Sequence, residues 1–332
     1  MDRTVTHGNR WRHLAAALQA PPPLVRRYAT GVEIEAGVVR CVTLACGRSA
    51  VEVVGAIAVP LPAGAIDGLD IVDPDAVVAA LAAALPVRRP ATRVGGRWFG
   101  EAPLVLGLCP ALVGRRVFSD AAPRLAGAAH TGDYTARPAR ARWSPGPAAV
   151  RHEVERGTGL AADTLAVDCV DQPDGRRCVV YVDKHHWSVR ADLFAALGHT
   201  LTALVDGAAA SINAMIWQAS ECEWIGLWAG ARACAGWHVD TATRAAAARP
   251  LFSMMARGSS EAMAALRGLA DAGMPPVTLA GHPQAVDEVA VVLGELGGLR
   301  PGRWQVPAGA HGPALGCEFA VAAGLALEGL LR

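Results

Sequence analysis

The regular part of the chain begins with three runs of apolar and β-branched residues, Ala29–Ile34, Val38–Ala45 and Val51–Val59. The second and third runs are separated by the short segment Cys46–Ala50, a spacing typical of a β-hairpin. We therefore expect three consecutive antiparallel strands. A helix is predicted to follow them, because Asp73-Pro74 matches the preferred N-cap and first residue of a helix.

A similar order of strands and helices returns later in the chain. The pattern predicts a second series consisting of strands Trp224–Trp228 and Arg232–Val239, a helix near Ser260–Leu269, a strand Val277–Ala280, and helices Gln284–Leu296 and Cys317–Leu331. Between the two series it predicts a strand Leu104–Leu108, a helix Ala148–Arg156, strands Leu165–Asp171 and Arg177–Val182, a helix Trp187–Leu197, a strand Leu201–Val205 and a helix Ala208–Trp217. This duplication predicts two related α/β lobes, each a mixed sheet with flanking helices.

Domain boundaries follow from the same pattern. Residues 1–27 contain three consecutive prolines and are expected to be a flexible or amphipathic N-terminal tail. The first lobe is predicted over 28–218, with an inserted subdomain at about 111–180 where the pattern is less regular. The second lobe, over 219–332, is expected to be trimmed between Asp240 and Pro276.

Composition excludes several classes of protein. With 52% hydrophobic and 18% charged residues, the 332-residue chain is not intrinsically disordered. Its net charge of +1 gives no overall field for nucleic acid, so nucleic-acid binding is disfavoured. Lys184 is the only lysine and does not lie in Gly-Lys-Ser/Thr, which excludes a P-loop; a protein kinase is excluded because no His-Arg-Asp motif occurs.

The spacing of the cysteines indicates whether the chain has a metal site, and its hydropathy indicates its cellular location. None of the eight cysteines forms Cys-x-x-Cys, so we expect no metal site and a reducing compartment. We find no signal peptide and no run of ~20 apolar residues, which predicts a cytoplasmic protein. His185-His186 is expected to be a strand-to-helix turn, and no serine has the context of a nucleophile, so no catalytic residue is assigned.

Four segments together resemble one known family. They are Gly31–Arg40, Val54–Pro74 with its Ile71-Val72-Asp73-Pro74, Ala195–Asp206, and the C-terminal Glu318–Gly329. In order and spacing they are similar to segments of the PilM/HofM-like pilus-assembly proteins, which belong to the actin-like ATPase superfamily. The resemblance covers most of residues 28–332 and implies an actin-like, ribonuclease H-like fold of two lobes.

That superfamily can hold ATP between its lobes, on two acidic phosphate hairpins and a glycine-rich adenosine turn. The resemblance places this cleft at seven residues: Glu33, Glu35, Gly37, Leu227, Gly230, Gly281 and His282. Glu35 stands where glycine is usual and would repel phosphate, Leu227 replaces an acidic residue, and His282 replaces the second glycine of the turn. We therefore expect a vestigial cleft, no catalysis, and weak or lost binding of Mg·ATP.

The resemblance also implies partners. PilM-like proteins bind the cytoplasmic tail of a bitopic inner-membrane protein of the PilN type and meet other pilus platform or motor proteins. We expect the same here: a non-catalytic cytoplasmic scaffold of the type IV pilus platform, peripheral to the inner membrane through its partner. Self-association stays open. The alternatives are a GspL-like component of a type II secretion platform and a nucleotide-binding actin-like ATPase or kinase.

Overall fold

The computed structural model describes most of the chain after residue 26. The described residues are 27–47, 50–85, 93–94, 97–98, 102–118, 152, 154–156, 159–171, 177–231, 233–240, 247–256, 264, 267–268, 275–297, 301–309 and 312–331. The chain divides into two compact units. The larger unit contains the described residues from Arg27 to Val113 and from Ser188 to Leu331, and the smaller one lies within Gly114–Trp187.

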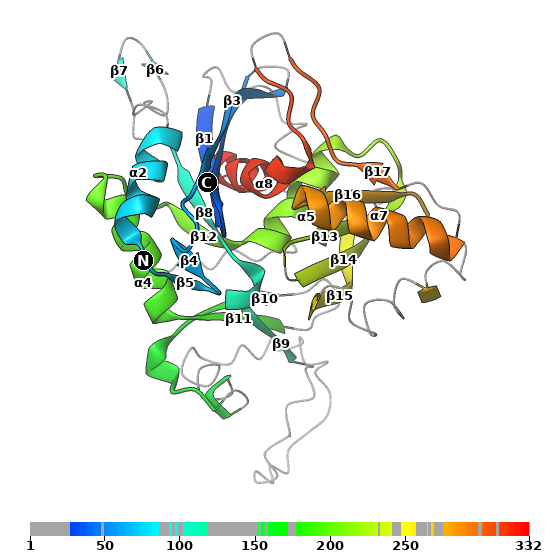
Figure 1. The fold of residues 1–332 in the computed structure, drawn as a ribbon, viewed down its shortest axis with the longest axis horizontal. Coiled ribbons are helices and arrows are strands. Elements are labelled where there is room, and N and C mark those ends of the chain that lie inside the picture. Colours follow the sequence, from blue (N-terminus) through cyan, green and yellow to red (C-terminus); the bar gives the residue numbers. More distant parts are fainter. Residues whose placement is uncertain are drawn as a thin grey trace, which may run out of the picture. The chain divides into compact units, whose positions relative to one another are not determined.

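A five-stranded mixed sheet begins the larger unit (Figure 1). Its order is β12-β8-β1-β2-β3, formed by β1 (Arg27–Glu35), β2 (Val38–Cys46), β3 (Val51–Pro60), β8 (Leu104–Leu108) and β12 (Ala203–Asp206). The first three strands are antiparallel, whereas β8 runs parallel to both β1 and β12. The predicted three-stranded start is thereby confirmed.

Two helices cover one face of this sheet. They are α2 (Pro74–Ala84) and α4 (Lys184–Ala196), and the latter belongs to the larger unit from Ser188 onward. The α2 helix begins where the sequence predicts it, because Asp73 Oδ1 accepts a hydrogen bond from Ala76 N at 3.0 Å. Buried residues of both helices, including Leu81 and Phe194, share an apolar core with β1, β2 and β8.

A second five-stranded sheet repeats the arrangement. Its order is β15-β14-β13-β16-β17, formed by β13 (Glu223–Ala229), β14 (Ala233–Asp240), β15 (Ala247–Ala256), β16 (Val277–Gly281) and β17 (Gly302–Arg303). Three antiparallel strands are again followed by two strands added in parallel. Helix α7 (Pro283–Gly297) covers one face, as shown in Figure 1. The predicted duplication is confirmed.

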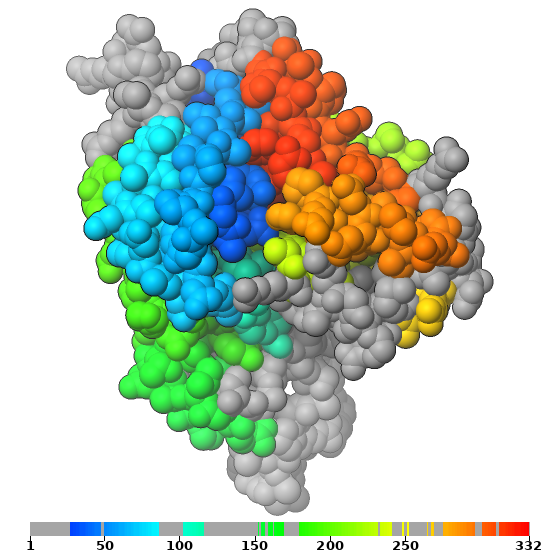
Figure 2. Space-filling model, in the orientation of Figure 1, coloured from blue at the N-terminus to red at the C-terminus, as the bar shows by residue number. Residues whose placement is uncertain are grey.

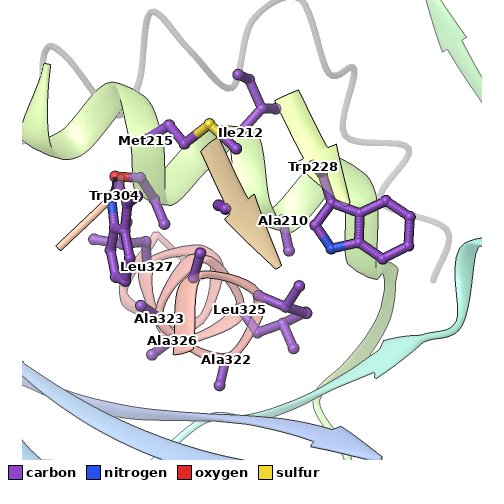
Figure 3. Packing of buried hydrophobic residues seen from close by; sticks show 14 of the residues in the cluster. Ala210, Ile212, Met215, Trp228, Trp304, Ala322, Ala323, Leu325, Ala326 and Leu327 are labelled. Atoms are coloured by element: carbon purple, nitrogen blue, oxygen red, sulfur yellow. Dashed lines mark hydrogen bonds between the residues drawn. The ribbon is translucent and has the colours of Figure 1, made fainter. Parts of the chain in front are cut away.

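Two central helices join the sheets. They are α5 (Gly207–Gln218) and α8 (Ala320–Leu330), the latter preceded by the short helix η3 (Cys317–Phe319). Figure 3 shows α8 seen nearly end-on, with Trp228 and Trp304 on either side of it. Residues of both helices and of both sheets form a single apolar core. The two lobes are therefore packed on one another through α5 and α8.

The smaller unit holds a three-stranded antiparallel sheet of order β10-β11-β9. Its strands are β9 (Gly114–Phe118), β10 (Leu165–Asp171) and β11 (Arg177–Asp183). Buried Val154, Leu165 and Val179 form its described core. The remaining short elements of the chain are β4 (Ile66–Asp67), β5 (Asp70–Ile71), β6 (Arg93–Val94), β7 (Arg97–Trp98), η1 (Pro110–Leu112) and η2 (Ala162–Thr164).

Some predicted elements differ from the observed ones. His185-His186 lies in the first turn of α4, which begins three residues earlier than expected. The second lobe also contains β15, a strand that the pattern did not predict. Most of the predicted helix near Ser260–Leu269 lies outside the described residues, as does the tail before Arg27. Among the described helices, none combines the length and the apolar character needed to cross a bilayer.

Candidate functional site

The first predicted phosphate hairpin is the turn between β1 and β2. Ala36 and Gly37 form this turn, and Gly37 has a φ of 90°, a conformation that glycine adopts without steric cost. The register places Glu33 opposite Arg40 across the two strands. Glu33 and Glu35 lie on one face of β1, because successive side chains of a strand alternate between faces.

That face is the one toward α8. Gly31, two residues before Glu33, packs so closely on α8 that a Cβ added to it would come within 2.1 Å of the carbonyl oxygen of Ala322. Hence Glu33, Glu35 and Arg40 occupy the side of the first sheet that faces the second lobe, at the carboxyl end of β1. This is where the sequence predicts the cleft.

The three side chains form one buried ionic cluster, here called the hairpin triad. Arg40 Nη1 donates to Glu35 Oε2 at 2.8 Å and to Glu33 Oε2 at 3.2 Å. Their side chains are only 7% (Arg40), 13% (Glu33) and 20% (Glu35) exposed. Because two carboxylates share one guanidinium nitrogen at low exposure, the triad satisfies its own charges internally.

Burial raises the pKa of Glu33 to about 8, with Arg40 opposing the rise and Glu35 adding to it. Burial alone would lower the pKa of Arg40, but the attraction of the two carboxylates outweighs burial and holds that pKa above its ordinary value. Burial therefore shifts Glu33 toward its protonated form, and the shorter of the two bonds from Arg40 is the one to Glu35.

Two further polar residues stand at the carboxyl ends of neighbouring strands. Cys109 follows β8, and burial raises the pKa of its thiol; a backbone hydrogen bond at Ala111 and the charge of Arg190 oppose the rise, whereas Glu35 and Glu33 add to it. Asp206 ends β12 and caps α5, accepting hydrogen bonds from Ala208 N and Ala209 N at 2.8 and 3.4 Å. Its carboxylate is therefore committed to the start of a helix.

The second predicted hairpin joins β13 and β14. Leu227 does not face the central helices: it is buried with residues of α7 on the other side of the sheet. Trp228 lies on the face toward α5 and α8, packed in the central core (Figure 3). The side of the second hairpin that faces the central helices therefore carries the indole of Trp228.

The predicted adenosine turn lies beside this hairpin. Gly281 pairs with Ala229 of β13. Only glycine fits at this position, because its φ is 123° and a Cβ added there would lie 2.1 Å from the carbonyl oxygen of Ala229. His282 N donates to Ala229 O at 2.8 Å, and His282 O accepts from Val286 N at 2.9 Å, which starts α7. Gly230, Gly281 and His282 therefore gather at the carboxyl ends of β13 and β16.

The seven predicted residues thus form two groups, one in each lobe. The short helix η3 contacts a strand of each lobe, β2 in the first and β16 in the second. The sequence analysis missed Arg40, Cys109 and Asp206 as site residues. A signal for Arg40 was present, because a two-residue turn at Ala36-Gly37 pairs it with Glu33. No such local signal in the sequence indicates Cys109, because its position beside the hairpin depends on the parallel pairing of β8 with β1.

Comparison of this chain with known proteins identifies its fold but not its family. No protein-family model and no curated protein matches the sequence. Solved structures do match, among them a chain of the "PilM-PilN type IV pilus biogenesis complex", with a TM-score of 0.58 and 17% identity. The match covers 91% of this chain and 98% of the other. The fold is actin-like. The two repeated sheets and the paired central helices are the two lobes of that actin-like fold.

Two other solved structures match less closely. The cytoplasmic domain of EpsL, described as an inner-membrane component of the type II secretion system of Vibrio cholerae, has a TM-score of 0.39 and 9% identity, over 76% of this chain and 81% of that one. A Bacteroides thetaiotaomicron protein with an actin-like ATPase fold has a TM-score of 0.44 and 6% identity, over 84% and 91%.

Proposed function

We propose that this protein is a non-catalytic scaffold of a type IV pilus assembly platform, which binds the cytoplasmic tail of a PilN-type inner-membrane protein. One observation carries the proposal: the actin-like fold matches a chain of the PilM–PilN complex over 91% of its own length and 98% of that chain's. The match extends over both lobes, so the proposed role rests on the whole described fold and not on one lobe alone.

The residues of the cleft do not fit Mg·ATP. An actin-like ATPase needs carboxylates free to hold Mg²⁺ through water and a hairpin backbone open to phosphate. Here Arg40 engages both acidic side chains of the first hairpin. In the second hairpin, Leu227 is buried against α7 and Trp228 is packed in the central core, so neither residue supplies a carboxylate there.

The charges of the hairpin triad also disfavour binding of a nucleotide. Placing a triphosphate against the hairpin triad brings its negative charge next to Glu35, and a buried like-charge contact costs several kcal/mol. Releasing Arg40 to bind phosphate would leave the two buried acidic side chains without their partner, which is also costly. Either route weakens binding, so the protein holds its cleft without nucleotide.

The tail of the membrane protein would be bound as an extended peptide. Such a peptide can add to a sheet edge through main-chain hydrogen bonds, with apolar pockets binding alternate side chains. The protein would then associate with the inner membrane through this partner.

Co-purification tests this proposal. The full chain is co-expressed with a tagged PilN-type protein from the same operon, solubilised with its tail intact, and with a matched variant whose tail is scrambled. We expect recovery with the native tail only, with or without Mg·ATP. Equal recovery with the scrambled tail, or none with either, would overturn the proposal. Recovery only with the tail of a secretion-system protein would instead support the GspL-like alternative.

A further inference from the structure

The segment between β17 and α8 links the edges of the two lobes. Its described residues, 304–309 and 312–316, are here called the strap. The strap follows β17, the edge strand of the second sheet, and two hydrogen bonds of Trp304 hold its first residue in place. Trp304 N donates to Leu279 O of β16 at 2.8 Å, and Trp304 Nε1 donates to Ala214 O of α5 at 2.9 Å. The indole is 2% exposed and belongs to the central core.

The two halves of the strap run beside each other as a narrow hairpin. Val306 and Leu315 exchange backbone hydrogen bonds of 3.0 and 2.9 Å, and Gly309 N donates to Gly312 O at 3.2 Å. Both Val306 and Leu315 are buried in the central core. These three backbone hydrogen bonds and the burial of Val306 and Leu315 hold the described residues of the strap in place.

The far end of the strap rests on the first lobe. A Cβ added to Gly312 would lie 1.8 Å from the carbonyl oxygen of Val53 in β3. Only glycine permits so close an approach of two backbones. Figure 2 shows the orange atoms of this part of the chain beside the blue atoms of β3, the edge strand of the first sheet.

We propose that the strap is a clasp that holds the two lobes at one fixed closure in the absence of nucleotide. Its start is bonded to the second lobe and to α5, and its tip is seated against β3 of the first lobe. Movement of the lobes about α5 and α8 would draw Gly312 away from Val53 or Trp304 away from Ala214. The strap therefore resists this movement at β3, the edge strand of the first sheet, in addition to the packing of the central helices.

A pair of alanine variants tests the clasp. Gly312→Ala introduces the conflicting Cβ, whereas Gly309→Ala makes the same change in the same strap, where an added Cβ meets nothing within 4 Å. Trp304→Phe is a second test at the other end, because it keeps an aromatic ring but removes the bond to Ala214 O. Fluorophores on unnatural amino acids at exposed Ala79 of α2 and Val291 of α7 report the distance between lobes without using cysteine.

In single-molecule energy transfer, we expect one narrow distance distribution for the native chain and for Gly309→Ala, unchanged by Mg·ATP. Gly312→Ala and Trp304→Phe should broaden it, and amide exchange in β3 should rise roughly tenfold. Circular dichroism checks that each variant is folded. If a folded Gly312→Ala or Trp304→Phe protein keeps the narrow distribution, or if Mg·ATP shifts the native one, the clasp proposal is wrong.

Discussion

Gly324 of α8 lies directly against Ala210 of α5: a Cβ added to Gly324 would fall 1.8 Å from the carbonyl oxygen of Ala210. The two central helices therefore cross at backbone contact. The same helix also meets the first sheet closely at Gly31. Small residues along α8 let it serve as a thin layer between the two lobes, and the shared core depends on this spacing.

Replacing Gly324 by valine should destabilise the protein strongly. The new side chain must push α5 and α8 apart, and overpacking of this kind typically costs about 1–3 kcal/mol or more. Thermal unfolding followed by circular dichroism should show a clear fall in Tm. Gly55→Ala in β3 is the control, because an added Cβ there meets nothing within 4 Å. A Gly324→Val protein as stable as Gly55→Ala would contradict the close crossing.

Removing the guanidinium of the hairpin triad should be costly. Arg40→Met leaves Glu33 and Glu35 buried together without a cation, and breaking a buried ion pair in this way costs about 3–5 kcal/mol. Urea unfolding at neutral pH measures the loss. The triple variant Arg40→Met, Glu33→Gln, Glu35→Gln should recover much of it, because no buried charge remains. An Arg40→Met protein of native stability would mean that the triad is solvated.

The raised pKa of Glu33 predicts a pH dependence with a definite sign. The carboxyl titrates near its ordinary value of 4.5 when unfolded and at about 8 when folded, so the folded state binds more protons between these values. The free energy of unfolding should therefore fall as pH rises from about 4.5 to about 8, by at most about 1.4 kcal/mol per pH unit from this group. Glu33→Gln should remove that part of the slope in urea titrations; an identical slope in both proteins would refute it.

The repeated lobes could be predicted from local patterns, but one strand could not. β15 begins with Ala247 and Ala248 and contains Pro250, residues that weaken any strand pattern. It forms because it is the edge strand of its sheet, where proline is tolerated, and because β14 offers it a partner. That stabilisation comes from tertiary pairing, so the sequence signal alone was too weak.

The cleft was harder to predict than the fold. Alternation in β13 separates Leu227 from Trp228, but only the packing of α7 and of the central helices decides which face each occupies. Only part of the hairpin triad could be predicted from the sequence. Glu33 and Glu35 belong to the predicted cleft, whereas the pairing of Arg40 with them follows only from the strand register. The clustering of Cys109 and Asp206 needs the sheet order as well.

Removal of one carboxylate should improve nucleotide binding if the triad is what weakens it. Labelled ATP with Mg²⁺ should not saturate the native protein at tens of micromolar, measured by fluorescence anisotropy. Glu35→Gly removes the repulsive charge and leaves Arg40 partly free, so its affinity should be at least about tenfold higher, equivalent to 1.4 kcal/mol. Micromolar affinity of the native protein would show that the cleft is functional.

The proposed function requires that this protein binds its partner independently of nucleotide. Isothermal titration of the synthetic cytoplasmic tail of the PilN-type protein into the full chain tests it most directly, with and without millimolar Mg·ATP. We predict a saturable isotherm with the same Kd in both conditions and none with a scrambled tail. No binding at tens of micromolar, or binding that appears only with Mg·ATP, would contradict the claim.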